Sequence, residues 1–207
     1  MRLGIFGGSF DPVHYGHLLL AESCREQCRL DQVWFVPAAI APHKQTRKLA
    51  ADRHRVEMLK LAIAGHEAMS VCELEIERGG LSYTVDTLAE IARMKPDAEL
   101  LLLMGADSLH DLATWHQPRR ICELALPVFV RRSGSPEVDL TALANLVSPA
   151  RLEQIRAHQV AMPLIELSST DIRDRVAQGK SIRYRTPRAV EKYIETYRLY
   201  QPMTNDQ

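Results

Sequence analysis

The chain contains 207 residues, of which 46% are hydrophobic and 25% are charged. This balance is typical of a globular protein that can bury a core, and at ~150 residues per domain the length suggests one or two domains. The 26 basic and 26 acidic side chains cancel, and only 6% of the residues are aromatic. A general nucleic-acid-binding protein would be more basic and more aromatic, so that class is disfavoured.

The four cysteines, Cys24, Cys28, Cys72 and Cys122, form no Cys-x-x-Cys pair. We expect small buried side chains there rather than metal ligands. No apolar run approaches the ~20 residues that span a bilayer, and the amino-terminal stretch lacks a signal region. We therefore expect a cytoplasmic protein without membrane or nucleic-acid partners. The oligomeric state stays open, a homo-oligomer included.

Short apolar runs alternate with amphipathic stretches along the chain. The predicted strands are residues 2–6, 32–36, 71–76, 100–104, 127–130 and 163–167. The predicted helices are residues 18–30, 54–64, 84–94, 169–177 and 187–197, the last with Thr186 as its cap. Residues 133–157 have the least regular pattern and are expected to form a loop-and-helix insertion.

This alternation of strands and helices predicts an α/β fold: a Rossmann-like, doubly wound, mainly parallel sheet with helices on both faces. We expect a single domain over residues 1–207, with the carboxyl-terminal helices (about 169–200) packed on the same body. In such sheets ligands bind beyond the carboxyl ends of the strands. The residues that follow each strand are therefore the candidate site.

The first strand runs into residues 7–17, which contain Gly7, Gly8 and a His-x-Gly-His pair, His14 and His17. Glycines allow a sharp turn and bring backbone N–H groups close to a ligand, and a helix that begins near the second histidine directs its positive end there. The alternative is a strand–turn–helix corner with two surface histidines. The glycines and paired histidines together favour a phosphate site.

Two other phosphate motifs are not satisfied. The glycines after the first strand do not form the Gly-x-Gly-x-x-Gly fingerprint of dinucleotide-binding proteins, and Pro37-Ala38 stands where an acidic residue would hold a ribose. The sequence Gly179-Lys180-Ser181 resembles the end of a P-loop, but Asp174 occupies the position of the required earlier glycine. A dehydrogenase and a P-loop enzyme are both disfavoured.

Residues 7–17 resemble the signature of the nucleotidyltransferase superfamily with a His-x-Gly-His motif, and residues 168–173 are similar to its second motif. Residues 42–44, 82–88 and 105–108, the last followed by Trp115, narrow the resemblance to bacterial nicotinate-nucleotide adenylyltransferases. The resemblance implies ATP and nicotinate mononucleotide as substrates, with deamido-NAD and pyrophosphate as products. An enzyme for another acceptor, or a nucleotide sensor without catalysis, is the alternative.

The implied reaction needs little proton chemistry. The attacking phosphate is already an anion at pH 7, and the leaving group is pyrophosphate, so positioning and charge neutralisation remain for the protein. Direct in-line attack without a covalent enzyme intermediate follows. The sequence offers no dense carboxylate cluster, so we expect Mg²⁺ to arrive on the ATP phosphates, with no dedicated protein ligands.

The resemblance assigns site residues by position. The catalytic set is His14, His17, Lys44 and Arg173. The backbone around Gly7, Gly8, Ser9 and Phe10 is expected beside the ATP phosphates, with Ser168 and Thr170 at the start of a helix and Asp107 on ribose hydroxyls. Plain alternatives are a solvated loop lysine for Lys44, a surface arginine for Arg173 and a helix cap for Asp107. Arg55 is a weaker candidate, because similar enzymes carry an arginine there.

Thr84 and Trp115 are the residues that the resemblance assigns to nicotinate mononucleotide. An aromatic plane can stack on the positively charged pyridine ring, and N–H groups at a helix start can donate hydrogen bonds to its carboxylate. A core tryptophan and an ordinary helix cap are the alternatives.

Overall fold

The computed structural model describes residues 1–40, 49–105, 108–132 and 139–202. Six parallel strands are found in this part of the chain, in the order β3-β2-β1-β4-β5-β6. They are β1 (Arg2–Gly8), β2 (Gln32–Pro37), β3 (Met69–Val71), β4 (Glu99–Gly105), β5 (Leu126–Arg132) and β6 (Val160–Met162).

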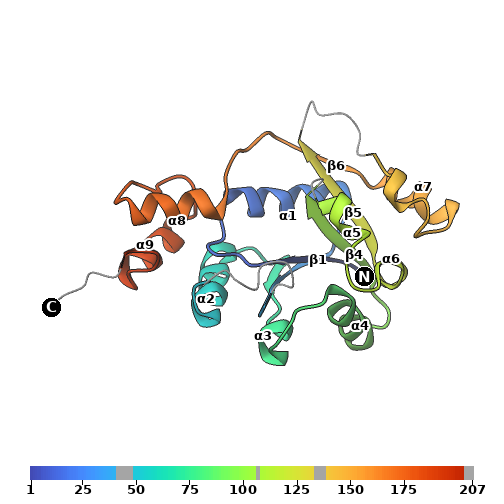
Figure 1. The fold of residues 1–207 in the computed structure, drawn as a ribbon, viewed down its shortest axis with the longest axis horizontal. Coiled ribbons are helices and arrows are strands. Elements are labelled where there is room, and N and C mark those ends of the chain that lie inside the picture. Colours follow the sequence, from blue (N-terminus) through green and yellow to red (C-terminus); the bar gives the residue numbers. More distant parts are fainter. Residues whose placement is uncertain (41–48, 106–107, 133–138, 203–207) are drawn as a thin grey trace.

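Helices cover both faces of the sheet. They are α1 (Tyr15–Gln27), α2 (Asp52–Ile63), α3 (Leu74–Arg78), α4 (Thr84–Met94), α5 (Ser108–Leu112), α6 (Pro118–Leu124), α7 (Pro149–Ala157), α8 (Ser169–Ala177) and α9 (Arg188–Thr196). Figure 1 shows α1 on one face and α2, α3 and α4 on the other. The predicted Rossmann-like α/β architecture is therefore confirmed. Among the described residues, no helix has the length and apolar character needed to cross a membrane.

The core lies on the central strands β1 and β4. Leu3, Leu101 and Leu103 are fully or almost fully buried, as expected for strands covered on both faces. The sheet is packed so closely that a Cβ on Gly4 would lie 2.7 Å from Cδ1 of Leu30. A larger residue at this position of β1 would require the Leu30 side chain to shift.

Two of the expected strands are wrong in extent. Residues 71–76 do not form one strand, because β3 ends at Val71 and α3 begins at Leu74. A short apolar alternation fits one helical turn equally well, and the structure buries Leu74 and Glu75 in that way. The strand expected at residues 163–167 is instead β6, Val160–Met162. Pro163 has no N–H to extend the ladder.

Other expectations need smaller corrections. Thr186 does not cap α9: Pro187 is the N-cap, and the Thr186 hydroxyl donates to the carbonyl of Val13 at 2.7 Å. Helices α5 and α6 were not predicted. Within the irregular region, α7 supplies the expected helix, while residues 133–138 lie outside the described part. Three cysteines are buried as expected, and Cys72 is only half-buried.

The carboxyl-terminal helices lie beside the start of α1 (Figure 1). The backbone N–H of Tyr15 donates to the carbonyl of Arg185 at 3.2 Å. Helix α9 packs against α2, where the hydroxyl of Tyr193 lies 2.9 Å from Nδ1 of His54. These contacts bring α8 to the loop that follows β1.

Candidate active site

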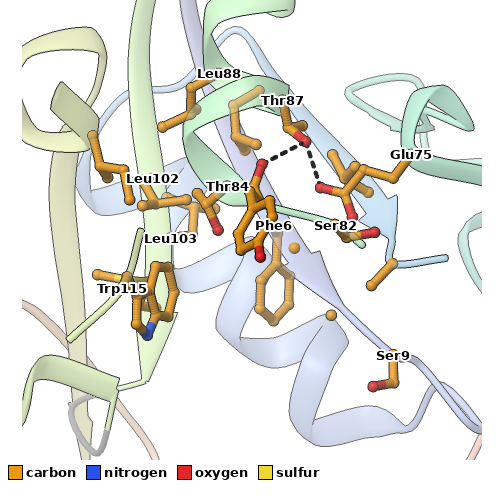
Figure 2. Close-up of a pocket in the computed structure, with 18 of the residues that line it drawn as sticks. Phe6, Ser9, Glu75, Ser82, Thr84, Thr87, Leu88, Leu102, Leu103 and Trp115 are labelled. Carbon is orange, nitrogen blue, oxygen red and sulfur yellow. Dashed lines mark hydrogen bonds between the residues drawn. The ribbon is translucent and has the colours of Figure 1, made fainter. Parts of the chain in front are cut away.

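A pocket opens where the strand order reverses. Strands β2 and β3 lie on one side of β1, and β4, β5 and β6 lie on the other. The connections that follow β1 and β4 therefore run in opposite directions, which leaves a crevice between these two strands. Ligands of doubly wound sheets bind in this crevice, beyond the carboxyl ends of the strands. A cavity of about 340 Å³ lies there, lined by the ends of β1 and β4, the start of α4, and Trp115 (Figure 2).

Thr84 and Trp115 line the same cavity. Thr84 is the first residue of α4. The first N–H groups of a helix have no acceptor within the helix, so those near Thr84 can donate to a ligand. Trp115 is half-buried, and its indole Nε1 is buried without a hydrogen-bond partner among the described residues. A buried indole N–H usually finds an acceptor, so this end of the cavity suits a ligand with an aromatic ring and acceptor atoms.

Glu75 is a buried residue of this cavity that sequence reasoning missed. Its Oε1 accepts a hydrogen bond of 2.7 Å from the Thr87 hydroxyl (Figure 2). That hydroxyl in turn accepts from Nη2 of Arg78 at 2.9 Å. Burial raises the pKa of the Glu75 carboxyl, while hydrogen bonds from Thr87 and Ser82 oppose this. In the sequence, Glu75 is one of the polar positions within the apolar alternation of residues 71–76, a pattern that predicts a strand and gives no sign of a buried carboxyl.

Gly7, Gly8 and Ser9 also line the cavity and lead into the loop between β1 and α1. The chain turns at Phe10, whose φ of 48° lies in the left-handed region. The Phe10 ring folds over Gly8, where a Cβ would meet Cζ of Phe10 at 3.0 Å. This ring contacts the His17 imidazole edge-on, with 5.1 Å between centroids. Phe10 therefore supports His17 from the core side.

His14 and His17 form a stacked pair at the start of α1. Their ring centroids lie 3.7 Å apart, and the backbone N–H of His14 donates to Nδ1 of His17 at 3.3 Å. Burial lowers the pKa of His14 to about 4. A histidine at its reference pKa of about 6.5 is readily protonated beside phosphates, but the burial of His14 opposes its protonation.

Arg55 connects the loops that follow β1 and β2. Its side chain is completely buried and donates to the carbonyls of Ser9 at 2.8 Å and Ala38 at 2.7 Å, as well as to the carboxylate of Asp52. A guanidinium that satisfies two backbone carbonyls fixes the loops after β1 and β2 relative to each other. Arg55 is thus a scaffold for the site, and its burial leaves no surface for substrate.

The second motif, at the start of α8, lies against the first. The Ser168 hydroxyl caps α8 by accepting from the N–H of Asp171 at 3.1 Å. The Ser169 hydroxyl donates to the carbonyl of Pro12 at 2.9 Å. Arg173 donates to the carbonyl of Asp11 through Nη1 and to the Thr170 hydroxyl through Nη2, the latter at 3.2 Å. Ser169 and Arg173 therefore bond the loop after β1, although more than 150 positions separate them from it in the sequence.

Comparison with known proteins agrees with this geometry. A family model described as cytidylyltransferase-like matches residues 5–175. The probable nicotinate-nucleotide adenylyltransferase of Thermomicrobium roseum is 48% identical, over 96% of this chain and 91% of its own. That of Thermus thermophilus is 44% identical, over 97% of this chain and 100% of its own. The chain belongs to the nicotinate-nucleotide adenylyltransferase family.

As a member of the nicotinate-nucleotide adenylyltransferase family, the protein is an enzyme of the nucleotidyltransferase class. Its fold also matches the solved structure of Plasmodium falciparum nicotinic acid mononucleotide adenylyltransferase complexed with NaAD. The TM-score is 0.75 at 18% identity, over 96% of this chain and 97% of that one. This match supports the fold, whereas the closer sequence relatives establish the family.

The structure brings the predicted residues of this adenylyltransferase together in two neighbouring groups. Gly7, Gly8, Ser9, Thr84 and Trp115 line the cavity. His14, His17 and Arg173 lie around the adjoining loop. Two further predicted residues, Lys44 and Asp107, fall outside the described part of the chain. Within the described part, no group of three or more His, Cys, Asp or Glu side chains could hold a metal ion.

Proposed function

We propose that this enzyme transfers the adenylyl group of ATP to nicotinate mononucleotide, forming deamido-NAD and pyrophosphate. One observation carries the proposal: the cavity with Thr84 and Trp115 leads through Gly7, Gly8 and Ser9 into the loop that holds the two histidines. Such a path accommodates a pyridine ring at one end and phosphates at the other. The relatives at up to 48% identity support the same assignment.

The pyridine end recognises both parts of the nicotinate group. The indole plane of Trp115 stacks on the positively charged ring, a contact worth ~0.5–2 kcal/mol. The N–H groups at the start of α4 donate hydrogen bonds to the carboxylate, and the positive end of that helix stabilises its charge. Glu75 fixes the segment before α4, because its carboxyl is hydrogen-bonded by both Ser82 and Thr87. Ser82 also accepts from the N–H of Ala39 at 3.0 Å.

At the phosphate end, the residues act as fixed donors. His14, His17 and Arg173 bind the ATP phosphates, with Lys44 as a further positive charge, and backbone N–H groups of Gly8, Ser9 and Phe10 lie beside them. Ser168 and Thr170 hold Arg173 at the start of α8, and Asp107 accepts from ribose hydroxyls. These donors neutralise charge on the α-phosphate and the departing pyrophosphate.

The reaction is a direct in-line displacement. An oxygen of the mononucleotide phosphate attacks the α-phosphorus of ATP, the bond to the β-phosphate oxygen breaks, and pyrophosphate leaves with the electron pair. No enzyme nucleophile takes part, so no covalent intermediate forms. The donors around the phosphates are nitrogen groups, which are poor ligands for Mg²⁺. The substrate is therefore the magnesium complex of ATP, with the metal held by phosphates and water.

Pyrophosphate release tests the function directly. The enzyme is incubated with ATP, Mg²⁺ and one acceptor at a time: nicotinate mononucleotide, nicotinamide mononucleotide, phosphopantetheine or glycerol 3-phosphate. We expect the first acceptor to give the highest kcat/KM. Activity with phosphopantetheine or glycerol 3-phosphate alone would assign the enzyme to another acceptor. Binding of ATP without turnover on any acceptor would indicate a nucleotide sensor.

A further inference from the structure

Asp11 lies in the loop between β1 and α1, which we call the phosphate loop, and connects it to the last described part of the chain. Its side chain is 1% exposed. Oδ1 accepts a hydrogen bond of 2.7 Å from the Tyr200 hydroxyl and one of 3.2 Å from the N–H of Ala50. Oδ2 is buried and forms no hydrogen bond among the described residues, but it lies 3.7 Å from Nη1 of Arg173. One carboxylate thus contacts three separate segments.

The two contacts of Arg173 with Asp11 differ in strength. Nη1 makes a close hydrogen bond to the backbone carbonyl of Asp11, whereas its distance to the carboxylate is beyond hydrogen-bond range. Arg173 is 14% exposed, so its side chain reaches the surface of the site. A guanidinium has five N–H donors, and only some are used by Asp11 and Thr170. The others are available for phosphate oxygens.

The carboxylate of Asp11 competes with phosphate for Arg173. A buried carboxylate is costly without hydrogen bonds or a cation, and it attracts whichever donors are within reach. Tyr200 and Ala50 together satisfy Oδ1. Burial and the adjacent carboxylate raise the pKa of the Tyr200 phenol well above its usual value, so its hydroxyl remains a donor. The hydroxyl therefore reduces the attraction between Asp11 and Arg173.

We propose that Tyr200 is a positioning residue for ATP binding: its hydrogen bond to Asp11 keeps the Arg173 guanidinium on the backbone carbonyl and available to the phosphates. Tyr200 acts through Asp11 and does not touch the substrate. Without the hydroxyl, the carboxylate draws Arg173 into a close ion pair and withdraws it from ATP. The inference rests on the proposed function only in placing ATP phosphates at Arg173.

Replacing Tyr200 with phenylalanine removes one hydroxyl and keeps the ring. Tyr193→Phe is the matched control, since its hydroxyl bonds His54 on α2 and has no contact with Asp11. Binding of magnesium α,β-methylene ATP is measured by calorimetry, with steady-state kinetics and thermal unfolding beside it. We expect Tyr200→Phe to raise the Kd of this analogue and the KM for ATP at least fivefold. The KM of Tyr200→Phe for nicotinate mononucleotide should stay within twofold of the wild type. In Tyr193→Phe, the Kd of the analogue and the KM for ATP should also stay within twofold.

A double variant tests whether the effect passes through the carboxylate. In Asp11→Asn the charge that draws Arg173 away is gone, so adding Tyr200→Phe should change the analogue Kd less than twofold. In both Asp11→Asn and the double variant the buried carboxylate charge is absent. Comparing these two proteins therefore also provides the test if Tyr200→Phe alone does not fold. A fivefold difference within the pair would overturn the proposal. So would a Tyr200→Phe enzyme that is less stable but binds the analogue normally.

The outcomes separate this inference from the proposed function. If the wild type binds the analogue but does not react with nicotinate mononucleotide, the acceptor assignment fails while the Tyr200 comparison stands. If the wild type is fully active and the two Tyr→Phe variants bind the analogue equally, Tyr200 is only a structural residue.

Discussion

The imidazole rings of His14 and His17 stack with centroids 3.7 Å apart and planes 23° from parallel. Two cations at this distance would repel each other, and burial already lowers the pKa of His14 to about 4. The pair can therefore take up a proton with little free-energy cost only when an anion is bound against it. This relationship links the protonation of the loop to the binding of phosphate.

We expect ATP binding to take up protons. Phosphates raise the pKa of His14 from about 4 toward neutrality, so at pH 6 the complex holds a proton that the free enzyme lacks. ATP affinity should therefore increase as the pH falls from 8 to 6. Calorimetry at pH 6 in buffers of different ionisation enthalpy measures the uptake, and His14→Gln should reduce it. Buffer-independent enthalpies in the wild type would contradict the linkage.

His17→Ala should abolish most turnover while the fold survives. The imidazole is expected to contact charge that develops in the transition state, and removing one such donor costs ~2.7–4 kcal/mol of barrier. Steady-state kinetics and circular dichroism test both parts. A variant that retained more than about a tenth of the wild-type kcat, a loss below ~1.4 kcal/mol, would exclude His17 from the catalytic residues.

Arg173→Ala should lower kcat and raise the KM for ATP. A hydrogen bond to a charged group contributes ~1.5–3 kcal/mol, so kcat/KM for ATP is expected to fall at least about tenfold. Arg175→Ala is the matched control on α8, because its Nε donates to the carbonyl of Ser181 at 2.9 Å, away from Asp11. Equal ATP kinetics in the two variants would mean that Arg173 does not bind the phosphates.

The enzyme should prefer nicotinate over nicotinamide mononucleotide by at least about tenfold in kcat/KM. The amide would place an NH₂ against one of the N–H donors near Thr84 and leave it unpaired, at a cost of ~1–3 kcal/mol. Trp115→Ala should weaken both acceptors together, because stacking recognises the ring and not its substituent. Equal efficiency of the two acceptors with the wild type would instead indicate a dual-specificity enzyme.

Arg55→Met should destabilise the protein. It leaves the carbonyls of Ser9 and Ala38 without the donors that Arg55 provides, which should lower the free energy of unfolding by ~2–5 kcal/mol. Arg53→Met, at an exposed position of the same helix, should change it by less than ~0.5 kcal/mol. Urea denaturation of both variants provides the measurement. Similar stabilities would mean that the buried guanidinium is not required by the loops.

Local signals in the sequence were sufficient for several elements. Helices α4 and α8 begin and end where the sequence predicted, because Ser168 caps α8 and Pro96 follows the end of α4. The most apolar run became the central strand β4. The loop after β1 was identified from glycines and histidines that lie next to each other in the chain. In each case the determining residues are neighbours in sequence.

The missed features depend on partners that lie far away in sequence. Arg55 is buried because it bonds the carbonyls of two loops, and Glu75 is buried because it accepts from the Thr87 hydroxyl. The spacing of apolar residues in the sequence does not encode such partners. The shortest strands were also misplaced, because three residues of β3 or β6 carry too little alternation to fix their bounds. Pairing with β2 and β5, rather than local preference, determines where they form.

Asp11 and Tyr200 stand 189 positions apart, so the phosphate loop is synthesised early and its hydrogen-bond partner late. A nascent chain that has reached β4 already contains β1, β2 and β3, and these four strands can pair while the ribosome adds the rest. At that stage the Asp11 carboxylate has neither Arg173 nor Tyr200 beside it and stays hydrated. Four strands of the sheet are thus present in the chain before the last residues of the proposed nucleotide site, and with the role proposed for Tyr200 that site is complete only once residue 200 has been synthesised.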